Sequence, residues 1–368
     1  MNKVAVVSHC TTKFSLDDVS VESLLALATK SLFEQTKNLT QKDIDAVLVS
    51  TNENKKYLSA IVSEMAGISP KISHSVESLC NSGTNSIVSA FSYLSAGLAD
   101  VALVVGAERF DSPGQVLEWD VSRGEYRHPV FWASMFTKAR KREFGTTDEE
   151  LAYVSAKNHK NATYNPSAYN PKKYTIDEIM NSKKITDDLR LLDCSRPCSG
   201  SSAVVLASES VARRFTDSPV WIRGVGQKTT SASFTKNDLT RLESTNAASL
   251  QAYQMSKISP GNVDVAEIHD AFTVCELMIL EDLGMVQKGH AGKHIIELYN
   301  TDSKKINPRG GLIGAGHPLG ATGISQVVEI ATQLEGNAGS RQVDGAKIGL
   351  VQNMSAAATS STVLILGS

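Results

Sequence analysis

Cys80 and His317 are two residues whose types and surroundings could together perform covalent chemistry. Cys80 lies in ESLCNSGTNSIVSAF, where a polar stretch gives way to the apolar spacing of a helix. A thiol at a helix start has a lowered pKa, because unpaired backbone N–H groups and the helix dipole favour the thiolate. An imidazole nearby could accept the thiol proton, and such a pair performs acyl transfer. The alternative is that Cys80 is a small buried hydrophobe, the commonest fate of a free cysteine.

His317 lies in the run NPRGGLIGAGHPLGATG, which begins at Asn307. So many glycines indicate tight turns or a close approach of the backbone to another group. Pro318 suits the first turn of a helix that follows directly. Because a single histidine is more often structural than catalytic, the case for His317 depends on the elements that position it.

Those elements are predicted to be strands and helices in alternation. Short β-branched runs at 4–7, 46–49 and 101–105 alternate with helical periodicity at 21–33 and 87–98. Such alternation is typical of βαβ units and a largely parallel sheet. The predicted fold class is therefore α/β.

The chain also contains an internal repeat. DIDAVLVST, from Asp43, resembles NVDVAEIHD, from Asn262, and CNSGTNSI, from Cys80, lines up with HPLGATGI, from His317. Repeats of this kind indicate two similar units that pack against each other. The repeat predicts that Cys80 and His317 stand at matching helix starts and face each other across the interface between the halves.

The same comparison aligns Gly83 with Gly320. It also leaves extra residues in the second half, which we assign to a longer loop between Gly284 and Asn307. The first half in turn carries a large insertion.

Length and composition fit an ordinary globular protein of about two domains, since the chain has 368 residues, 41% hydrophobic and 21% charged. The net charge of -2 gives no basic field that would attract nucleic acid. No apolar run is long enough to cross a bilayer. Five cysteines, an odd number, favour reduced thiols. We expect a cytoplasmic protein that binds neither nucleic acid nor membrane.

Three blocks of the sequence, LCNSG, IHDAF and NPRGGLIGAGHPLGATG, resemble the motif blocks of thiolases. KREFGTTDEELAYVSAKNHKNATYNP resembles the loop domain of the sterol-carrier-protein-type and archaeal thiolases, and LLDCSRPCSGSSAVVLAS resembles the strand that closes their first half. Together these segments cover most of the chain.

The resemblance implies the thiolase fold, in which duplicated βαβαβαββ halves form a five-layered α-β-α-β-α arrangement. Residues 1–110 and 192–215 would form the N-terminal half, 111–191 the inserted loop domain that binds coenzyme A, and 216–368 the C-terminal half.

The resemblance also implies roles for three residues. Cys80 would be the nucleophile that accepts the acyl group, and His317 the base that deprotonates it. His269, in the IHDAF block, would help to bind the thioester oxygen. An imidazole N–H, or a water that it holds, can stabilise a developing enolate oxygen. His269 could instead be a structural histidine at a strand end.

The sequence departs from the family at the second cysteine, which in most thiolases acts as acid/base on the α-carbon. The C-terminal loop has Asn353 where one group of thiolases has this cysteine, and the IHDAF block has Ala271 where another group has it. Ser355 stands near the glycine whose N–H normally completes an oxyanion hole, so Asn353 and Ser355 are candidates for that hole.

Cys275 is one candidate for the missing acid/base, because four residues beyond Ala271 is about one helical turn on the same face. Core packing is the favoured interpretation of this cysteine. His269 or His317 could act instead, since an imidazole suits proton transfer near neutral pH.

Residues that could contact the substrate are His159, which matches a family histidine near the pantetheine, Gly316, and Arg140. Arg140 belongs to the basic run at 138–142, which is most often a solvated helix face but could also meet the phosphates of coenzyme A.

We expect no metal and no cofactor beyond the coenzyme A thioesters that serve as substrates. Cys194 and Cys198 are spaced too loosely for a zinc pair, so buried strand-end thiols are favoured. His290 and His294 could bind a metal only on a helix, which the glycines of GHAGKH discourage.

These observations predict an acetyl-CoA C-acetyltransferase, which condenses two acetyl-CoA molecules to acetoacetyl-CoA and coenzyme A or runs the reverse thiolysis. The order Cys80, His269, His317 also resembles the Cys-His-His set of decarboxylating ketoacyl synthases, whose carbanion needs no base. A non-catalytic acyl-CoA-binding subunit is a third hypothesis. The resemblance further implies a homodimer or homotetramer, and, as partners, an OB-fold zinc protein and hydroxymethylglutaryl-CoA synthase.

Overall fold

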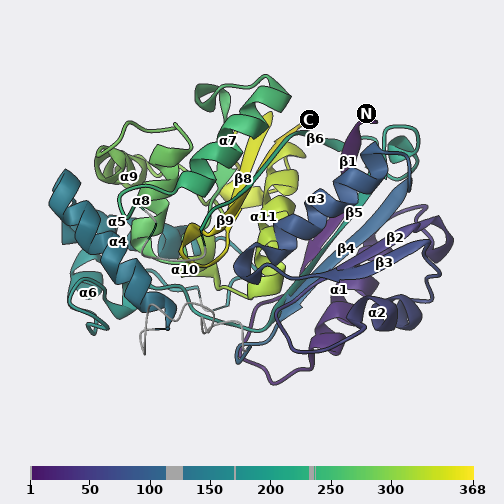
Figure 1. Cartoon of the computed structure of the whole chain (residues 1–368), viewed down its shortest axis with the longest axis horizontal. Helices are drawn as coiled ribbons and strands as arrows, with labels where there is room; N and C mark the ends of the chain where they lie inside the picture. Colours follow the sequence, from purple (N-terminus) through teal and green to yellow (C-terminus); the bar gives the residue numbers. More distant parts are fainter. Residues whose placement is uncertain (1, 113–126, 170, 232–235, 237) are drawn as a thin grey trace.

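The computed structural model describes residues 2–112, 127–169, 171–231, 236 and 238–368. In this part of the chain the strands form one nine-stranded sheet in the order β3-β2-β4-β5-β1-β6-β9-β8-β7 (Figure 1). The strands of the first half are β1 (Val4–Thr11), β2 (Ala46–Ser50), β3 (Ile72–Val76), β4 (Val101–Glu108) and β5 (Gly200–Ser208). Those of the second half are β6 (Val220–Thr229), β7 (Val265–Glu267), β8 (Ile348–Met354) and β9 (Ser360–Gly367).

The strand order confirms the duplication. Read outward from the centre of the sheet, β1, β5, β4 and β2 are mirrored by β6, β9, β8 and β7. β2 is parallel to β4, as β7 is to β8, while β5 and β9 are antiparallel to their neighbours. The two halves join where Ala5 pairs with Trp221 and Val6 with Val220.

Helices cover both faces of each half and give the layer order α-β-α-β-α (Figure 1). On the first half the outer helices are α1 (Val21–Gln35) and α2 (Leu58–Ala66), and on the second half α7 (Glu243–Ser256) and α8 (Thr273–Asp282). The helices α3 (Ser82–Ser95) and α11 (Leu319–Leu334) form the central layer. The thiolase-like architecture expected from the motifs is therefore present.

Alternate side chains of β1 point to opposite faces of the sheet, so this one strand packs against helices on both faces. Val4 and Val6 pack with α3 and α11 in the central core, whereas Ala5 and Val7 pack with α1 and α2 in the outer core. Successive side chains of a strand point to opposite faces, so a strand covered on both sides must be apolar throughout.

Between β4 and β5 the chain forms α4 (Pro129–Phe144), α5 (Asp148–Ala162) and α6 (Ile176–Met180), as the inserted segment predicts. A capping box starts α5, since Thr147 Oγ1 accepts from the Glu150 N–H at 3.1 Å and the Glu150 carboxylate accepts from the Thr147 N–H at 3.0 Å. The domain boundaries at 110 and 191 stay a prediction.

The loop predicted between Gly284 and Asn307 is wrong, because the segment contains the helix α9 (Ala291–Asn300). Ala291, Ile295 and Leu298 lie on one buried face and pack into the core of the second half. This apolar spacing outweighs the low helix propensity of glycine. A second short helix, α10 (Gly311–Ala315), precedes His317. Among the helices of the described ranges, none has the length and apolar content needed to cross a bilayer.

Candidate active site

Cys80 lies in a tight turn directly before α3. The turn (Leu79–Asn81) is a short 3-10 helix, and Leu79 has a φ of 51°, in the left-handed region that a branched apolar residue rarely adopts. Ser82 holds this turn by donating its hydroxyl to the Leu79 carbonyl oxygen at 2.6 Å. Strain of this kind persists where the surroundings impose it, and here it presents the thiol at the interface of the two halves.

Cys80, His269 and His317 converge as predicted. The ligand atoms of the three side chains all lie within 4.8 Å of one another, and the two imidazole rings stand edge to face with centroids 5.2 Å apart. His269 follows β7, and its N–H donates to Gln352 at 3.1 Å, while His317 directly precedes the start of α11. The halves thus contribute the thiol from one side and both imidazoles from the other.

All three groups are neutral at rest. Desolvation, with a smaller contribution from the Glu108 charge, raises the pKa of Cys80 to about 12, so the lowered thiol pKa predicted from the helix start is not found. Desolvation also lowers the pKa of His269 to about 3, opposed by the neighbouring Asn353 side chain. Desolvation and the nearby His269 hold the pKa of His317 well below its usual value. The Cys80 thiolate is therefore scarce in the free protein, and a base must take the thiol proton for Cys80 to act as a nucleophile.

The tautomer of His317 is set by Thr322. His317 Nδ1 lies 2.8 Å from Thr322 Oγ1, and that hydroxyl donates its own hydrogen to the Pro318 carbonyl oxygen at 2.9 Å. The Thr322 oxygen therefore accepts from Nδ1–H, which leaves Nε2 as the ring atom that can accept a proton.

A cavity of about 150 Å³ opens onto the three residues. Its walls are mainly apolar and come from α4, the segment that precedes β5, the IHDAF segment and the C-terminal loop. The lining residues are Leu79, Cys80, His128, Pro129, Val130, Trp132, Cys194, Ser195, Pro197, His269, Ala271, Phe272, His317, Leu319, Met354, Ser355 and Ala356. A water-poor, preformed hollow of this kind suits acyl chemistry on a thioester.

The sequence did not single out His128 or Trp132, and it assigned Cys194 to a buried strand end. All three line the cavity. His128 Nδ1 accepts from the Val130 N–H at 3.3 Å at the start of α4, so the neutral ring carries its hydrogen on Nε2. No local motif marks these residues, because α4 and the segment that precedes β5 reach the site only through the tertiary fold.

The structure places Cys275 outside the cavity. It is fully buried in α8, its backbone N–H donates to the Phe272 carbonyl oxygen at 2.9 Å, and desolvation strongly raises the pKa of its thiol. Cys275 packs in the core of the second half, so the interpretation as core packing holds and the acid/base role is not supported.

The C-terminal loop was expected to supply an oxyanion hole at Asn353 and Ser355, but both residues donate hydrogen bonds within the protein. Ser355 lines the cavity, but its backbone N–H donates to the Ser360 carbonyl oxygen at 2.9 Å. Asn353 is buried, and its Nδ2 donates to Gln326 at 2.6 Å. Ala356 also lines the cavity. An oxyanion hole at Asn353 or Ser355 stays a prediction.

Arg140 cannot be a surface contact for phosphate. The side chain is 1% exposed, and it forms a bidentate ion pair with Glu281, with Nη1 to Oε2 at 2.8 Å. Glu281 in turn accepts from the backbone N–H groups of Gly289 and Ala291 at the start of α9. The predicted substrate contact is therefore wrong, because Arg140 joins α4 to α8 instead.

His159 and Gly316 lie near the site without lining the cavity. His159 is buried in α5 with its ring edge-on to Tyr174, and its Nδ1 has no hydrogen-bond partner within the described part. Gly316, which precedes His317, has a φ of 107°, and a Cβ there would meet the Cys198 sulfur at 2.7 Å. Contacts of either residue with substrate stay predictions.

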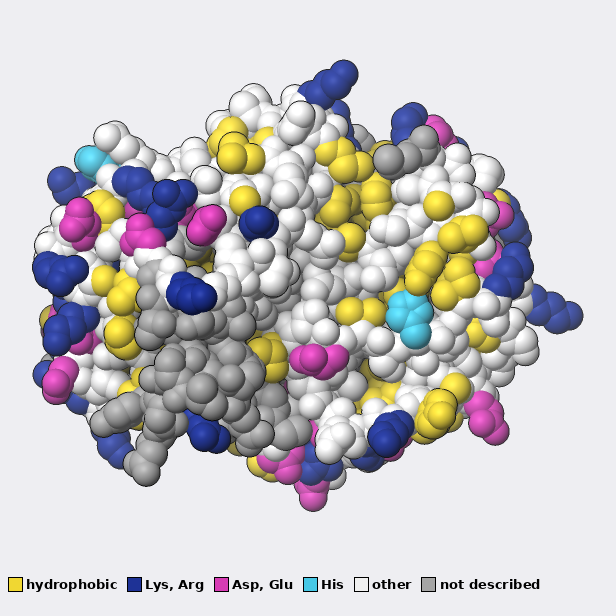
Figure 2. All heavy atoms as spheres, viewed as in Figure 1, with side chains coloured by type: hydrophobic (Ala, Val, Ile, Leu, Met, Phe, Trp, Pro, Cys, Tyr) yellow, Lys and Arg dark blue, Asp and Glu magenta, His cyan; other side chains and the backbone are white. Residues whose placement is uncertain are grey.

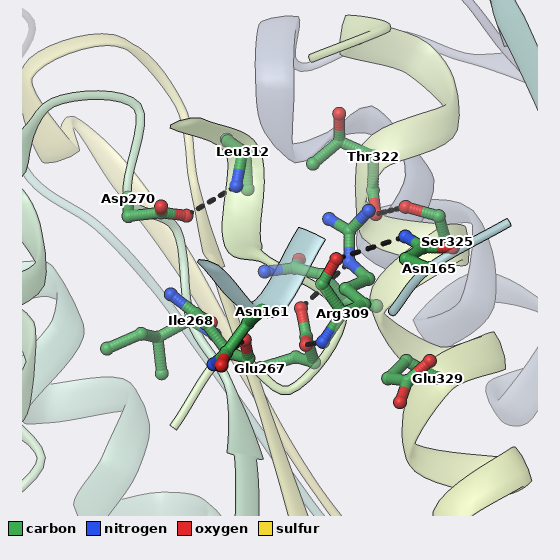
Figure 3. A network of polar contacts seen from close by, with 12 residues as sticks. Asn161, Asn165, Glu267, Ile268, Asp270, Arg309, Leu312, Thr322, Ser325 and Glu329 are labelled. Carbon is green, nitrogen blue, oxygen red and sulfur yellow. Dashed lines mark hydrogen bonds and ion pairs between the residues drawn. The ribbon is translucent and has the colours of Figure 1, made fainter. Parts of the chain in front are cut away.

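A buried polar network is centred on Arg309 and Glu267 (Figure 3). Figure 3 shows Arg309 reaching from its loop toward the helix that carries Thr322 and Ser325, and its Nε donates to Glu267 at 2.8 Å. The Arg309 charge contributes to the lowered pKa of both His269 and His317. It thereby helps to keep both rings neutral.

Asp270, the residue after His269, fixes the glycine-rich run. Its carboxylate accepts from the N–H of Leu312 at 2.6 Å and of Ile313 at 3.3 Å, at the start of α10 (Figure 3). A Cβ at Gly311 would meet that carboxylate at 2.3 Å, which explains the glycine there. Asp270 thus links the segment of His269 to the segment of His317.

One sulfur and two imidazole nitrogens at this spacing could also hold a metal ion such as zinc. Among the described residues this is the one such cluster of three ligands, and His290 and His294 have no third ligand beside them there. The absence of a metal from the reaction stays a prediction.

A duplicated α/β fold with a thiol and two neutral imidazoles between its halves defines a class of enzymes that carry acyl groups on cysteine. The chain matches the model of the thiolase N-terminal domain over residues 4–210 and that of the thiolase C-terminal domain over residues 226–368. The chain therefore belongs to the thiolase family.

Relatives and solved structures agree with this assignment. The acetyl-CoA acetyltransferase of Methanothermobacter thermautotrophicus is 36% identical, over 96% of each chain. Sterol carrier protein 2 of Bos taurus is 34% identical over 76% of this chain and 56% of its own length. The Ltp2-ChsH2(DUF35) aldolase superposes with a TM-score of 0.88 at 23% identity, over 100% of this chain and 98% of that one, and thus supports the fold alone.

Proposed function

We propose that this thiolase is an acetyl-CoA C-acetyltransferase, which condenses two acetyl-CoA molecules to acetoacetyl-CoA and coenzyme A, or cleaves acetoacetyl-CoA in reverse. The observation that carries the proposal is the convergence of Cys80, His269 and His317 on one apolar cavity. The relatives named acetyl-CoA acetyltransferase, at 36% and 34% identity over most of the chain, support the choice of substrate.

In the first half of the reaction, Cys80 attacks the thioester carbon while its proton passes to His317 Nε2. A high thiol pKa makes the thiolate scarce but strongly nucleophilic, so a base must remove the proton during attack. His269 lines the same cavity, and its ring can bind the oxygen that becomes negative, directly or through a water. Coenzyme A leaves, and the acetyl group stays on Cys80.

In the second half, a further acetyl-CoA loses a methyl proton, and the resulting carbanion attacks the acetyl group on Cys80. The mainly apolar lining of the cavity disfavours water, which would otherwise hydrolyse the thioester or quench the carbanion. Neither His269 nor His317 is a strong base here, since desolvation depresses the pKa of both rings.

The nucleophile is tested by mixing the protein with acetyl-CoA and locating the acetyl adduct by mass spectrometry. We expect one adduct, on Cys80, and loss of both adduct and acetyl exchange in Cys80→Ala. Cys10→Ala is the matched control, because Cys10 is a part-buried thiol in β1, apart from the cavity. A fully active Cys80→Ala variant would contradict the proposal, and acyl-CoAs of increasing length would report the chain-length preference.

The decarboxylating alternative is favoured by one observation, that a cysteine and two histidines meet in space. Such an enzyme would use malonyl-CoA, whose loss of carbon dioxide forms the carbanion without a base. Comparing acetyl-CoA with malonyl-CoA as the second substrate separates the two, and we expect product from acetyl-CoA alone.

We also propose that the protein forms a homodimer, or a tetramer built from dimers, through the free edge of β3. β3 is an end strand of the sheet, and hydrophobic side chains gather in Figure 2 on the part of the face where Figure 1 draws α3 and β3. Open sheet edges beside apolar surface are usually covered. Light scattering should give twice or four times the chain mass, and a monomer would contradict this. Co-purification from the native source tests the OB-fold zinc protein and hydroxymethylglutaryl-CoA synthase as partners.

A further inference from the structure

The condensation needs a group that removes a proton from carbon, and the structure offers a thiol for it. Ala271 and Asn353 stand at the two positions where other thiolases have their second cysteine, and Cys275 lies in the core. Of the described residues that line the cavity, Cys194 is the cysteine besides Cys80. Building on the proposed function, we propose that Cys194 is the acid/base that moves the proton of the α-carbon.

The fold anchors Cys194 directly opposite the IHDAF segment. Cys194 forms an isolated β-bridge with Phe272, and the N–H of the next residue, Ser195, donates to the Ala271 carbonyl oxygen at 2.8 Å. The Cys194 sulfur lies 3.4 Å from the Arg190 carbonyl oxygen, to which its hydrogen can be donated. The side chain is only partly buried, as a group that exchanges protons with substrate must be.

Cys194 also stands apart from the compact group of Cys80, His269 and His317. That group has its ligand atoms within 4.8 Å of one another and does not include Cys194, although all four residues line the same cavity. Both cysteines therefore border the space in which the substrate would lie. Carbon–carbon bond formation requires that the acid/base and the acetyl group reach the second substrate from one cavity.

The other groups that line the cavity are poorer bases. Desolvation lowers the pKa of His269 to about 3 and that of His317 well below its usual value, and it also lowers the pKa of His128. Desolvation, assisted by the Asp193 charge, instead raises the pKa of Cys194 to about 12. A thiolate of high pKa is a much stronger base than these imidazoles, and the thiol holds its proton until one is needed.

The protons balance over one cycle. During acylation the Cys80 proton passes to His317, which hands it to the departing coenzyme A sulfur as the carbon–sulfur bond of acetyl-CoA breaks. The neutral His317 then takes the proton of Cys194. The Cys194 thiolate then removes a methyl proton from the second acetyl-CoA. The carbanion attacks the acetyl carbon, the bond to Cys80 breaks with its electron pair on sulfur, and His317 returns the proton to Cys80.

The two half-reactions provide the test. We expect Cys194→Ala and Cys194→Ser to form the acetyl adduct on Cys80 at pH 8 to 9, because Cys80 and His317 carry out acylation without Cys194. Condensation and thiolysis should fall by about 100- to 10,000-fold, the usual contribution of a general acid/base. Exchange of the acetyl-CoA methyl hydrogens with deuterated water should fall in parallel.

The matched control is Cys275→Ala, which removes a buried thiol outside the cavity and should leave both half-reactions intact. Ala271→Cys in the Cys194→Ala background should restore part of the condensation, because Ala271 lines the same cavity opposite Cys194. This rescue would not follow from a merely structural role of Cys194.

Wild-type condensation in Cys194→Ala would overturn the proposal. So would loss of the Cys80 adduct in that variant, which would show general damage to the site, or a selective loss of condensation in Cys275→Ala. Failure of the proposed function would look different, since the unaltered protein would then form no adduct with acetyl-CoA.

Discussion

At the scale of single residues, the site keeps its reactive groups uncharged until substrate arrives. The same desolvation that raises the pKa of Cys80 lowers the pKa of His269 and His317. A preformed thiolate–imidazolium pair is therefore disfavoured in the free enzyme. Interactions that strengthen only as charge develops accelerate the reaction more than those already made at rest.

The first prediction concerns Thr322, which fixes the His317 tautomer through its hydroxyl. Thr322→Val keeps the shape but leaves Nδ1–H without an acceptor, and an unsatisfied buried donor costs about 1–3 kcal/mol. We expect the rate of Cys80 acylation to fall roughly 10- to 100-fold, because the ring no longer prefers the tautomer with a free Nε2, and the Tm to fall as well. Rapid-quench mass spectrometry measures this rate. Thr322→Ser, which keeps the hydroxyl, is the control, and equal rates for the two variants would refute the role.

At the scale of elements, the chemistry depends on how closely two helices approach. The repeat aligned Gly83 with Gly320, and both glycines lie where α3 and α11 meet. A Cβ at Gly83 would lie 2.9 Å from the backbone nitrogen of Ile324. Small residues at this crossing let the starts of the two helices bring Cys80 and His317 together.

Gly323→Ala tests this close approach. A Cβ at Gly323 would lie 2.6 Å from the backbone nitrogen of Thr84, so α3 and α11 must move apart. Overpacking of this kind costs about 1–3 kcal/mol, and a displacement of about 1 Å at the site can cost roughly 100-fold in rate. We expect a lower Tm and a larger fall in kcat. The control is Gly261→Ala, where a Cβ meets open space, and full activity of Gly323→Ala would contradict the argument.

The elements also show what the sequence could and could not predict. Cys80, His269 and His317 were predictable, because each stands in a motif or at a repeated helix start. Arg140 was misassigned, since a basic run hides which of its members faces inward. Cys194 was overlooked as a catalytic candidate, because only the pairing of two distant segments brings it to the cavity.

At the scale of the whole molecule, the two duplicated halves pack together and enclose the active site between them. Each half alone would leave one face of its strands and its central helix exposed, and the core formed by α3 and α11 is shared by both halves of the sheet. Because buried area drives folding, the two halves should unfold together, and the active site should be lost at the same transition. Buried titratable groups then make that transition sensitive to pH.

His159 provides the clearest case of such pH sensitivity. Desolvation, with the nearby Arg196 charge, lowers its pKa to about 4, whereas an unfolded histidine titrates near 6.5. Between these values the unfolded chain binds a proton that the folded chain does not, so the free energy of unfolding falls as the pH falls. The loss is about 1.4 kcal/mol per pH unit for this residue, or roughly 3 kcal/mol from pH 6.5 to pH 4.

His159→Phe isolates this contribution, because a phenyl ring can keep the edge-on contact with Tyr174, whose ring centroid lies 4.7 Å away. The ring atom Nδ1 has no partner within the described part of the chain, so no hydrogen bond is lost there. We expect the stability of the variant, relative to the unaltered protein, to rise as the pH is lowered through this window. Urea unfolding at several pH values measures the difference. A difference that stays constant with pH would mean that His159 has the same pKa in the folded protein as in the unfolded chain.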